Sequence, residues 1–107
     1  MLAVELDTSP VPTLFFALGA RGKPAERVAD EAVDQATTYL TSGPGVVDAH
    51  SADQLVLPLA LAEGPSEYQV AEATLHLTTN IAVIRQFLDR DIVCECEEGG
   101  PGVVRVR

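Results

Sequence analysis

Hydrophobic and polar residues alternate near the start of this 107-residue chain. Residues 2–7 place Leu, Val and Leu against Ala, Glu and Asp, which predicts a half-buried strand. After Pro10 and Pro12, residues 13–18 form a continuous apolar run that predicts an inner strand. We therefore expect the chain to begin with two strands separated by a proline-containing connection.

The clearest periodic pattern follows the second strand and predicts a long helix. Pro24 suits the first turn of a helix, and apolar residues then recur at helical spacing as far as Leu40. Acidic residues occupy the opposite side, where Arg27 can pair with Glu31 four positions later. We interpret this charged side as a solvated face, and we expect the helix to end at residues 42–45, Ser-Gly-Pro-Gly.

A buried helix is predicted in the middle of the chain. Residues 46–47 suggest a short strand before it, and Ser51 and Gln54 match a capping box that can begin a helix. The predicted helix over 55–62 is apolar almost all round, which favours burial. Pro58 should kink or shorten it, because proline lacks the backbone N–H that a helix interior requires.

The last third of the chain predicts one more helix between strands. Residues 67–73 have a strand pattern, and a third helix is expected to begin near Thr78 or Thr79, either of which could cap it. Residues 92–97 and 103–107 then predict a closing hairpin around a glycine-rich turn. Strands that alternate with helices indicate an α/β fold (an α+β sandwich), with helices on a face of one sheet.

Length and composition narrow the class of protein. The length fits a single domain over 1–107, and a hydrophobic fraction of 47% is ordinary for a globular chain. No apolar run approaches the roughly 20 residues that span a bilayer, and the first residues do not resemble a signal peptide. We therefore expect a cytoplasmic protein without a membrane partner. The net charge of −9 repels phosphate backbones, so weak or no RNA binding is expected from this chain alone.

Two cysteines, Cys94 and Cys96, share one predicted strand. Side chains two positions apart on a strand leave the same face, but this spacing is poor for a mutual disulfide. With no second cysteine pair, the sequence does not predict a structural zinc site. We interpret the pair as two small apolar side chains on one face of the strand, and no metal ligands are assigned.

The chain has two histidines, His50 and His76, and a histidine in such a protein is more often a hydrogen-bonded core or surface residue than a catalyst. His76 falls between a predicted strand and a predicted helix, where exposed helix N–H groups can attract phosphate oxygens. An imidazole nitrogen attacks phosphorus effectively when a partner orients its other nitrogen, and Asp53 is the natural partner or magnesium contact. Simpler interpretations stay open, since Asp53 and Gln54 suit the first turn of a helix without any further role.

Three stretches, at 18–28, 52–62 and 76–84, together resemble the RNA 3'-terminal phosphate cyclase family. They read LGARGKPAERV, ADQLVLPLALA and HLTTNIAVI, and their joint order and spacing are specific. The family pattern usually has Glu after the first Leu-Gly, whereas this chain has Ala20, so no role is carried over to that position.

The resemblance implies an ATP-dependent ligase reaction that converts an RNA 3'-phosphate into a 2',3'-cyclic phosphate, with a divalent metal (Mg or Mn) as cofactor. It implies that His76 becomes covalently adenylylated in a nucleotidyl-transfer step. Asp53 matches an active-site aspartate near that histidine, and Gln54 adjoins it in the family motif. His50 takes the position of an aromatic ring that stacks on adenine, so His50, Asp53 and Gln54 are the implied ATP-binding residues.

The resemblance covers only the C-terminal portion of the much longer family enzymes. It implies a βαβαββ-type unit like the C-terminal domain of initiation factor three, and it suggests a fragment, a truncated gene product or one piece of a split enzyme. The isolated chain is therefore expected to be inactive without the N-terminal part. The implied partners are an RNA 3'-phosphate end in the full enzyme and the missing N-terminal part. A homodimer is also expected, because a segment cut from a larger enzyme should expose an apolar face.

Two other hypotheses compete with a catalytic segment. The first is a truncated, non-catalytic cyclase-like module that binds or acts as a scaffold. Cyclase-like proteins of ribosome assembly lack the histidine, so the presence of His76 favours the catalytic hypothesis. The second is the related enolpyruvyl transferases, which share the repeated fold but not the motifs at His76 and Asp53.

Overall fold

The computed structural model describes residues 1–9, 12–43 and 46–107. Contacts between Cα atoms divide the chain into two compact units, Met1–Gly45 and Val46–Arg107, and each is described by itself. Pro10 and the last two residues of the predicted helix end at 42–45 lie outside the described residues. A single domain over 1–107 stays a prediction.

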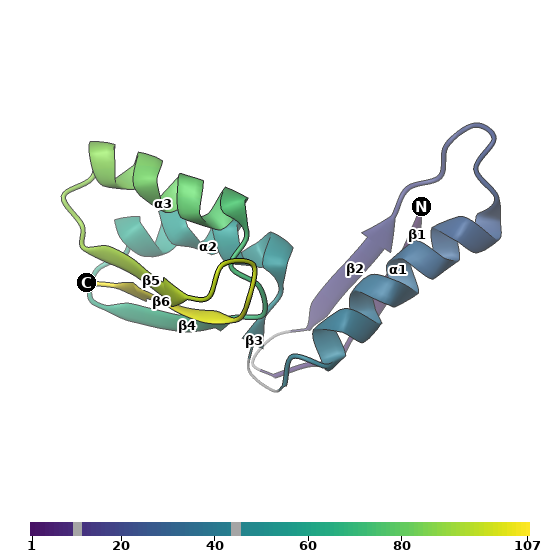
Figure 1. Ribbon diagram of the computed structural model, residues 1–107, viewed down its shortest axis with the longest axis horizontal. Helices are drawn as coiled ribbons and strands as arrows, with labels where there is room; N and C mark the ends of the chain where they lie inside the picture. The colour runs from purple at the N-terminus through teal and green to yellow at the C-terminus, as the bar shows by residue number, and fades with distance from the viewer. Residues whose placement is uncertain (10–11, 44–45) are drawn as a thin grey trace. The chain divides into compact units, whose positions relative to one another are not determined.

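The first unit is a two-stranded sheet with one helix packed on it. Strand β1 (Leu2–Leu6) pairs antiparallel with β2 (Thr13–Ala17), and α1 (Ala25–Leu40) lies alongside both strands (Figure 1). Phe15 and Tyr39 meet in the core with their ring centroids 5.4 Å apart. The half-buried first strand and the long helix are confirmed here, because their periodicity matches the side that each element buries. The second strand also forms, but it belongs to a two-stranded sheet and exposes Leu14 and Phe16, so the prediction of an inner strand is wrong.

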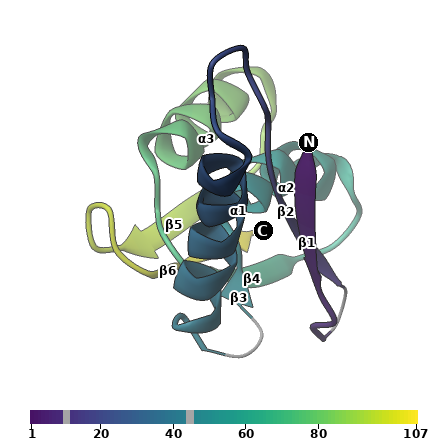
Figure 2. The same cartoon turned by 90° about the vertical axis from the view of Figure 1, so that its right-hand side faces the viewer.

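The second unit contains two helices on one face of a four-stranded mixed sheet. Its elements are β3 (Val46–Val47), α2 (Ala49–Leu61), β4 (Ser66–Val70), α3 (Leu75–Phe87), β5 (Ile92–Cys96) and β6 (Gly102–Val106). The strand order is β3-β4-β6-β5; β3 is parallel to β4, and the other neighbouring pairs are antiparallel. In Figure 1 both α2 and α3 lie on the same side of β4, β5 and β6, and Figure 2 shows the same cartoon turned by 90°. The α/β class and the βαβαββ order are confirmed, although β1 and β2 form a separate sheet.

The core of the second unit lies between the sheet and the two helices. Its largest fully buried side chains are Leu77, Ile92, Val56, Val70, Val104 and Val106. The sequence pattern of α2 favoured burial all round, but Leu57 and Leu61 are 47% and 66% exposed, so that prediction is wrong. The sheet covers only one side of α2, and its outer side therefore faces solvent. No helix within the described residues is long and apolar enough to cross a membrane.

The start of α2 differs from the predicted capping box. The helix begins six residues earlier than expected, at Ala49, and Asp48 is its N-cap. The Asp48 carboxylate accepts the backbone N–H groups of His50 and Ser51, both at 3.0 Å. Ser51 and Gln54 therefore lie inside the helix, because an acceptor three residues upstream already satisfies the first turn. The helix also continues past Pro58 to Leu61, so the predicted shortening is wrong, while a kink at Pro58 stays a prediction.

The start of α3 also lies upstream of its predicted position. Thr74 is the N-cap, and its hydroxyl accepts the Leu77 N–H at 3.2 Å. Thr78 and Thr79 are therefore helical residues, and the prediction that either one caps the helix is wrong. As a consequence, His76 lies within the first turn of α3 and not in the connection before it.

Candidate active site

A hollow of about 600 Å³ lies open to solvent where α2 and α3 run side by side. Asp53 lines it from α2, and five residues line it from α3: Leu75, His76, Thr79, Asn80 and Val83. The two residues that the sequence analysis placed in catalysis, His76 and Asp53, therefore lie at one site although 23 positions separate them in the chain. The hollow thus combines an imidazole, a carboxylate, polar side chains and apolar walls.

His76 is exposed in the first turn of α3, directly after Leu75. The first N–H groups of a helix have no intrahelical acceptor, and the helix dipole adds positive potential at this end. Both effects attract an anion such as a phosphate group. An exposed imidazole at this position can therefore meet an incoming phosphate without displacing any buried side chain.

Asp53 is half-buried, and hydrogen bonds from two other elements reach the backbone beside it. The Asn80 side-chain amide donates to the Asp53 carbonyl at 2.8 Å, and the Tyr68 hydroxyl donates to the Ala52 carbonyl at 2.7 Å. Burial, with smaller contributions from Cys94 and Asp53, raises the pKa of Tyr68 well above its usual range. The Tyr68 hydroxyl therefore stays protonated and available as a donor at physiological pH.

His50 and Gln54 do not line this hollow. Both are exposed on α2, four positions apart, so they are neighbours on the helix surface. His50 also lies one turn before Asp53, which places it close to the carboxylate side of the site. The structure thus brings Asp53 and His76 together, while His50 and Gln54 lie on the adjoining surface of α2.

The family resemblance implies a divalent cation, but the described residues do not offer a complete set of metal ligands. The described residues contain no group of three or more His, Cys, Asp or Glu side chains that could hold a metal ion. Asp53 could supply one carboxylate ligand, but the described residues alone do not fit a metal centre.

Both cysteines are free; burial and the neighbouring Cys96 thiol raise the pKa of Cys94 to about 11.

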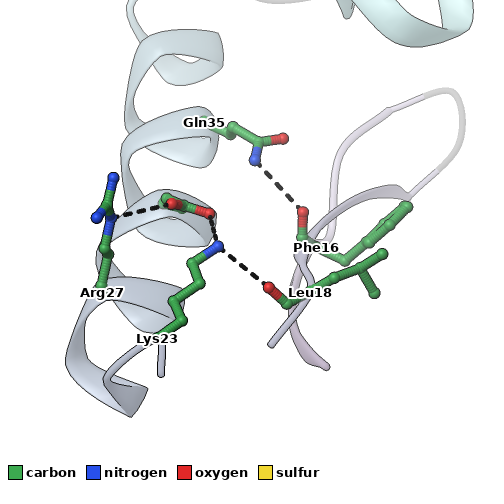
Figure 3. Close-up of polar contacts among 6 residues, drawn as sticks. Phe16, Leu18, Lys23, Arg27 and Gln35 are labelled. Carbon is green, nitrogen blue, oxygen red and sulfur yellow. Dashed lines mark hydrogen bonds and ion pairs between the residues drawn. The ribbon is translucent and has the colours of Figure 1, made fainter. Parts of the chain in front are cut away.

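Side chains in the first of the three family-like stretches hold α1 against β2. The Lys23 ammonium group donates to the Leu18 carbonyl at 3.1 Å and pairs with Glu31 at 2.6 Å (Figure 3). Arg27 also pairs with Glu31, at 3.6 Å, so the predicted pairing is confirmed. Gln35 donates to the Phe16 carbonyl at 3.3 Å. Glu31 thus partly neutralises two of the chain's cations within the first unit.

Several residues of the hollow were not singled out in the sequence. Thr79, Asn80 and Val83 follow His76 at spacings of three, four and seven positions, which are the spacings of one helix face. That periodicity could have placed them beside His76 once the start of α3 was known. Tyr68 gave no comparable signal, because its contact with α2 joins residues that are far apart in sequence.

The second unit is thus a βαβαββ unit that brings a histidine and an aspartate to one hollow on adjacent helices. A family profile described as RNA 3'-terminal phosphate cyclase matches residues 4–94. The chain therefore belongs to the RNA 3'-terminal phosphate cyclase family.

Individual relatives agree with the family match. The RNA 3'-terminal phosphate cyclase of Ectopseudomonas mendocina (strain ymp) is 51% identical over 94 residues, which cover 88% of this chain and 27% of that protein. The one from Salmonella typhimurium (strain LT2) is 44% identical over 99 residues, covering 92% and 29%. The one from Thermococcus onnurineus (strain NA1) is 52% identical over 90 residues, covering 84% and 26%. The chain thus spans between a quarter and a third of the length of these relatives.

Proposed function

We propose that this chain supplies the nucleotidyl-transfer segment of an RNA 3'-terminal phosphate cyclase, with His76 as the nucleophile that accepts AMP from ATP. The observation that carries the proposal is the shared hollow of His76 and Asp53 between α2 and α3. An exposed imidazole at a helix N-terminus, beside a carboxylate that can orient it, has the features of an activated nitrogen nucleophile. A cytoplasmic location stays a prediction.

In the first step a ring nitrogen of His76 attacks the α-phosphorus of ATP. A P–N bond forms as the P–O bond to pyrophosphate breaks, and pyrophosphate leaves with that electron pair. Asp53 accepts a hydrogen bond from the other ring nitrogen, which stabilises the positive charge that develops on the imidazole. N–H groups in the first turn of α3 stabilise the charge on the phosphate oxygens.

The second and third steps transfer AMP and close the ring. An oxygen of the RNA 3'-phosphate attacks the phosphorus of the adenylylated His76, so the P–N bond breaks and neutral imidazole is restored. The RNA 2'-hydroxyl then attacks the activated 3'-phosphorus and loses its proton, while AMP leaves. The intermediate on His76 divides one difficult displacement into easier ones.

The ATP contacts of this proposal lie on the outer side of α2. His50 offers a flat ring that can stack on adenine, and the neighbouring Gln54 offers a side-chain amide for hydrogen bonds. Both residues are exposed and near Asp53 in the helix, which supports a nucleotide extending from the hollow along α2. Because neither residue lines the hollow that holds His76, we assign both to ATP binding and not to bond making.

RNA and the pyrophosphate group need positive charge that this chain does not provide. Its net charge is −9, and the described residues offer no metal-ligating cluster near His76. We propose that the remaining part of a cyclase, on the same or another chain, supplies these groups and covers exposed apolar residues such as Leu14 and Phe16 of β2, which are 56% and 50% exposed. Sedimentation at increasing concentration tests the alternative, a homodimer.

Intact-mass analysis after incubation with ATP and magnesium tests the proposal. The isolated chain is expected to be inactive without its N-terminal part, so the assay is run on the chain alone and on the chain joined to that part. With that part present we expect a covalent AMP adduct on the wild type and none on His76→Ala. The matched control His50→Ala should still form the adduct but should require a higher ATP concentration, because it loses a stacking contact and not the nucleophile. An adduct that persists in His76→Ala would contradict the proposal. No adduct on any variant would exclude autonomous transfer and favour a binding or scaffold role.

A further inference from the structure

Two consecutive carbonyl groups of α2 receive hydrogen bonds from outside the helix. The Tyr68 hydroxyl, from β4, reaches Ala52, and the Asn80 amide, from α3, reaches Asp53. A carbonyl inside a helix normally accepts one N–H group, from the residue four positions later. Each of these two bonds is therefore a second hydrogen bond to the same carbonyl oxygen. Strand β4 is thereby joined to α2 at Ala52, and α3 is joined to α2 at the next residue, Asp53, which is the residue of α2 that lines the hollow.

The position of these bonds coincides with a weakness in α2. Pro58 has no N–H group, so it leaves the Gln54 carbonyl without its helical donor, and a proline ring crowds the carbonyl four residues before it. The helix is therefore least restrained by its own bonds next to Asp53. Tyr68 and Asn80 supply donors from neighbouring elements to the two carbonyls that precede this point.

The bond from Asn80 also connects the two candidate catalytic residues. Asn80 follows His76 by four positions, so the two side chains are neighbours on one face of α3. Its amide reaches the backbone of Asp53, which makes the path from His76 to Asp53 a single helical turn and one hydrogen bond of 2.8 Å. A shift of α2 relative to α3 would therefore stretch or break this bond.

We propose that Tyr68 and Asn80 are positioning residues that hold Asp53 at the distance and orientation in which it activates His76. This inference rests on the proposed function, because it assigns them an effect on His76 through Asp53. Tyr68 donates to α2 from β4 and does not line the hollow, whereas Asn80 donates to α2 from α3 and lines the hollow. Loss of these hydrogen bonds leaves both His76 and Asp53 present, but the position of Asp53 relative to His76 is no longer fixed.

The reactivity of His76 toward diethyl pyrocarbonate tests the inference without ATP, metal or RNA. In this reaction an imidazole nitrogen attacks the carbonyl carbon; an N–C bond forms, a C–O bond breaks, and ethyl carbonate leaves and decomposes to ethanol and carbon dioxide. Mass spectrometry of peptides measures the rate at His76 and at His50 in the full chain, with N-acetylhistidine as external standard. Each rate reports the nucleophilicity of one imidazole.

The decisive variant is Tyr68→Phe, which removes one oxygen at a distance from the hollow. We expect Asp53→Asn and Tyr68→Phe each to lower the rate at His76 between about twofold and tenfold, the range that one net hydrogen bond contributes. The double variant should be no slower than Asp53→Asn alone, because Tyr68 acts through Asp53 and coupled residues are not additive. Asn80→Ala should behave as Tyr68→Phe does.

The matched control is Arg90→Gln. Arg90 donates to the Gly64 carbonyl at 2.8 Å and so makes a comparable bond beyond the opposite ends of α2 and α3. Its loss should leave the rate at His76 unchanged. Circular dichroism and the melting temperature identify any variant that fails to fold. If either Tyr68→Phe or Asn80→Ala fails to fold, the other one alone is compared with the wild type.

The outcomes separate this inference from the proposed function. If Asp53→Asn slows His76 and folded Tyr68→Phe and Asn80→Ala do not, the positioning role is overturned and the role of Asp53 stands. A further slowing by Tyr68→Phe in the Asp53→Asn background would also overturn it, since Tyr68 would then act independently. If the expected pattern appears and ATP leaves no adduct, the positioning role stands while autonomous AMP transfer fails.

Discussion

Asp48 is a buried carboxylate with 8% of its surface exposed, and it accepts the N–H groups of His50 and Ser51. These two bonds start the helix that carries Asp53. We expect Asp48→Ala to lower the free energy of unfolding by about 1–2 kcal/mol, the usual cost of losing such a cap. Urea denaturation at neutral pH measures the change. Asp48→Asn keeps an acceptor oxygen and should lose much less, so equal losses would contradict a capping role.

Individual residues also show which parts of the candidate site could not be predicted from the sequence. His76 and Asp53 were selected from the motifs, and the structure places both in one hollow. Tyr68 and Asn80 were not selected, because their bonds to α2 join residues 16 and 27 positions apart. No local spacing encodes such contacts, since they depend on how a strand and two helices pack.

At the scale of elements, the β5–β6 hairpin depends on the absence of a side chain at Gly102. This residue pairs with Cys96, and a Cβ atom at Gly102 would lie 2.5 Å from the Cys96 Cβ and 2.8 Å from the Glu95 carbonyl oxygen. Both obstacles are parts of β5 that cannot rotate away. Gly102→Ala should therefore move the strands apart and destabilise the chain by about 1–3 kcal/mol, as overpacking does.

Thermal unfolding of Gly102→Ala beside Gly19→Ala checks this prediction. A Cβ atom at Gly19 would meet no atom within 4 Å, so that variant should melt within a few degrees of the wild type. Equal melting temperatures for Gly102→Ala and the wild type would show that β5 can move at no cost. Such a result would contradict the steric argument.

The elements themselves were largely predictable, and their ends were not. The helix α1 was predictable because its apolar stripe is long and periodic, and the stripe reaches Leu40, where the helix ends just before the expected stop at residues 42–45. The starts of α2 and α3 were placed too late, since Asp48 and Thr74 cap them upstream of the residues that matched the expected cap patterns. Several residues can cap a helix, and packing decides which one does.

At the scale of the whole molecule, the net charge of −9 governs association with nucleic acid. Affinity for RNA usually rises at low salt because cationic proteins release counterions from the phosphates. We expect the isolated chain to lack this rise with an oligonucleotide that ends in a 3'-phosphate, as measured by fluorescence anisotropy between low and physiological salt. A steep increase at low salt would contradict the prediction and reveal a local cationic surface that outweighs the net charge.

The strand order has a consequence for the synthesis of the chain. Strand β6, the last of the second unit to be made, lies between β4 and β5, and its Val104 and Val106 are fully buried. Before residues 102–106 emerge from the ribosome, β3 can pair with β4, but β5 has no neighbour in the sheet and the core lacks Val104 and Val106. The sheet of the second unit can therefore close only after β6 has emerged.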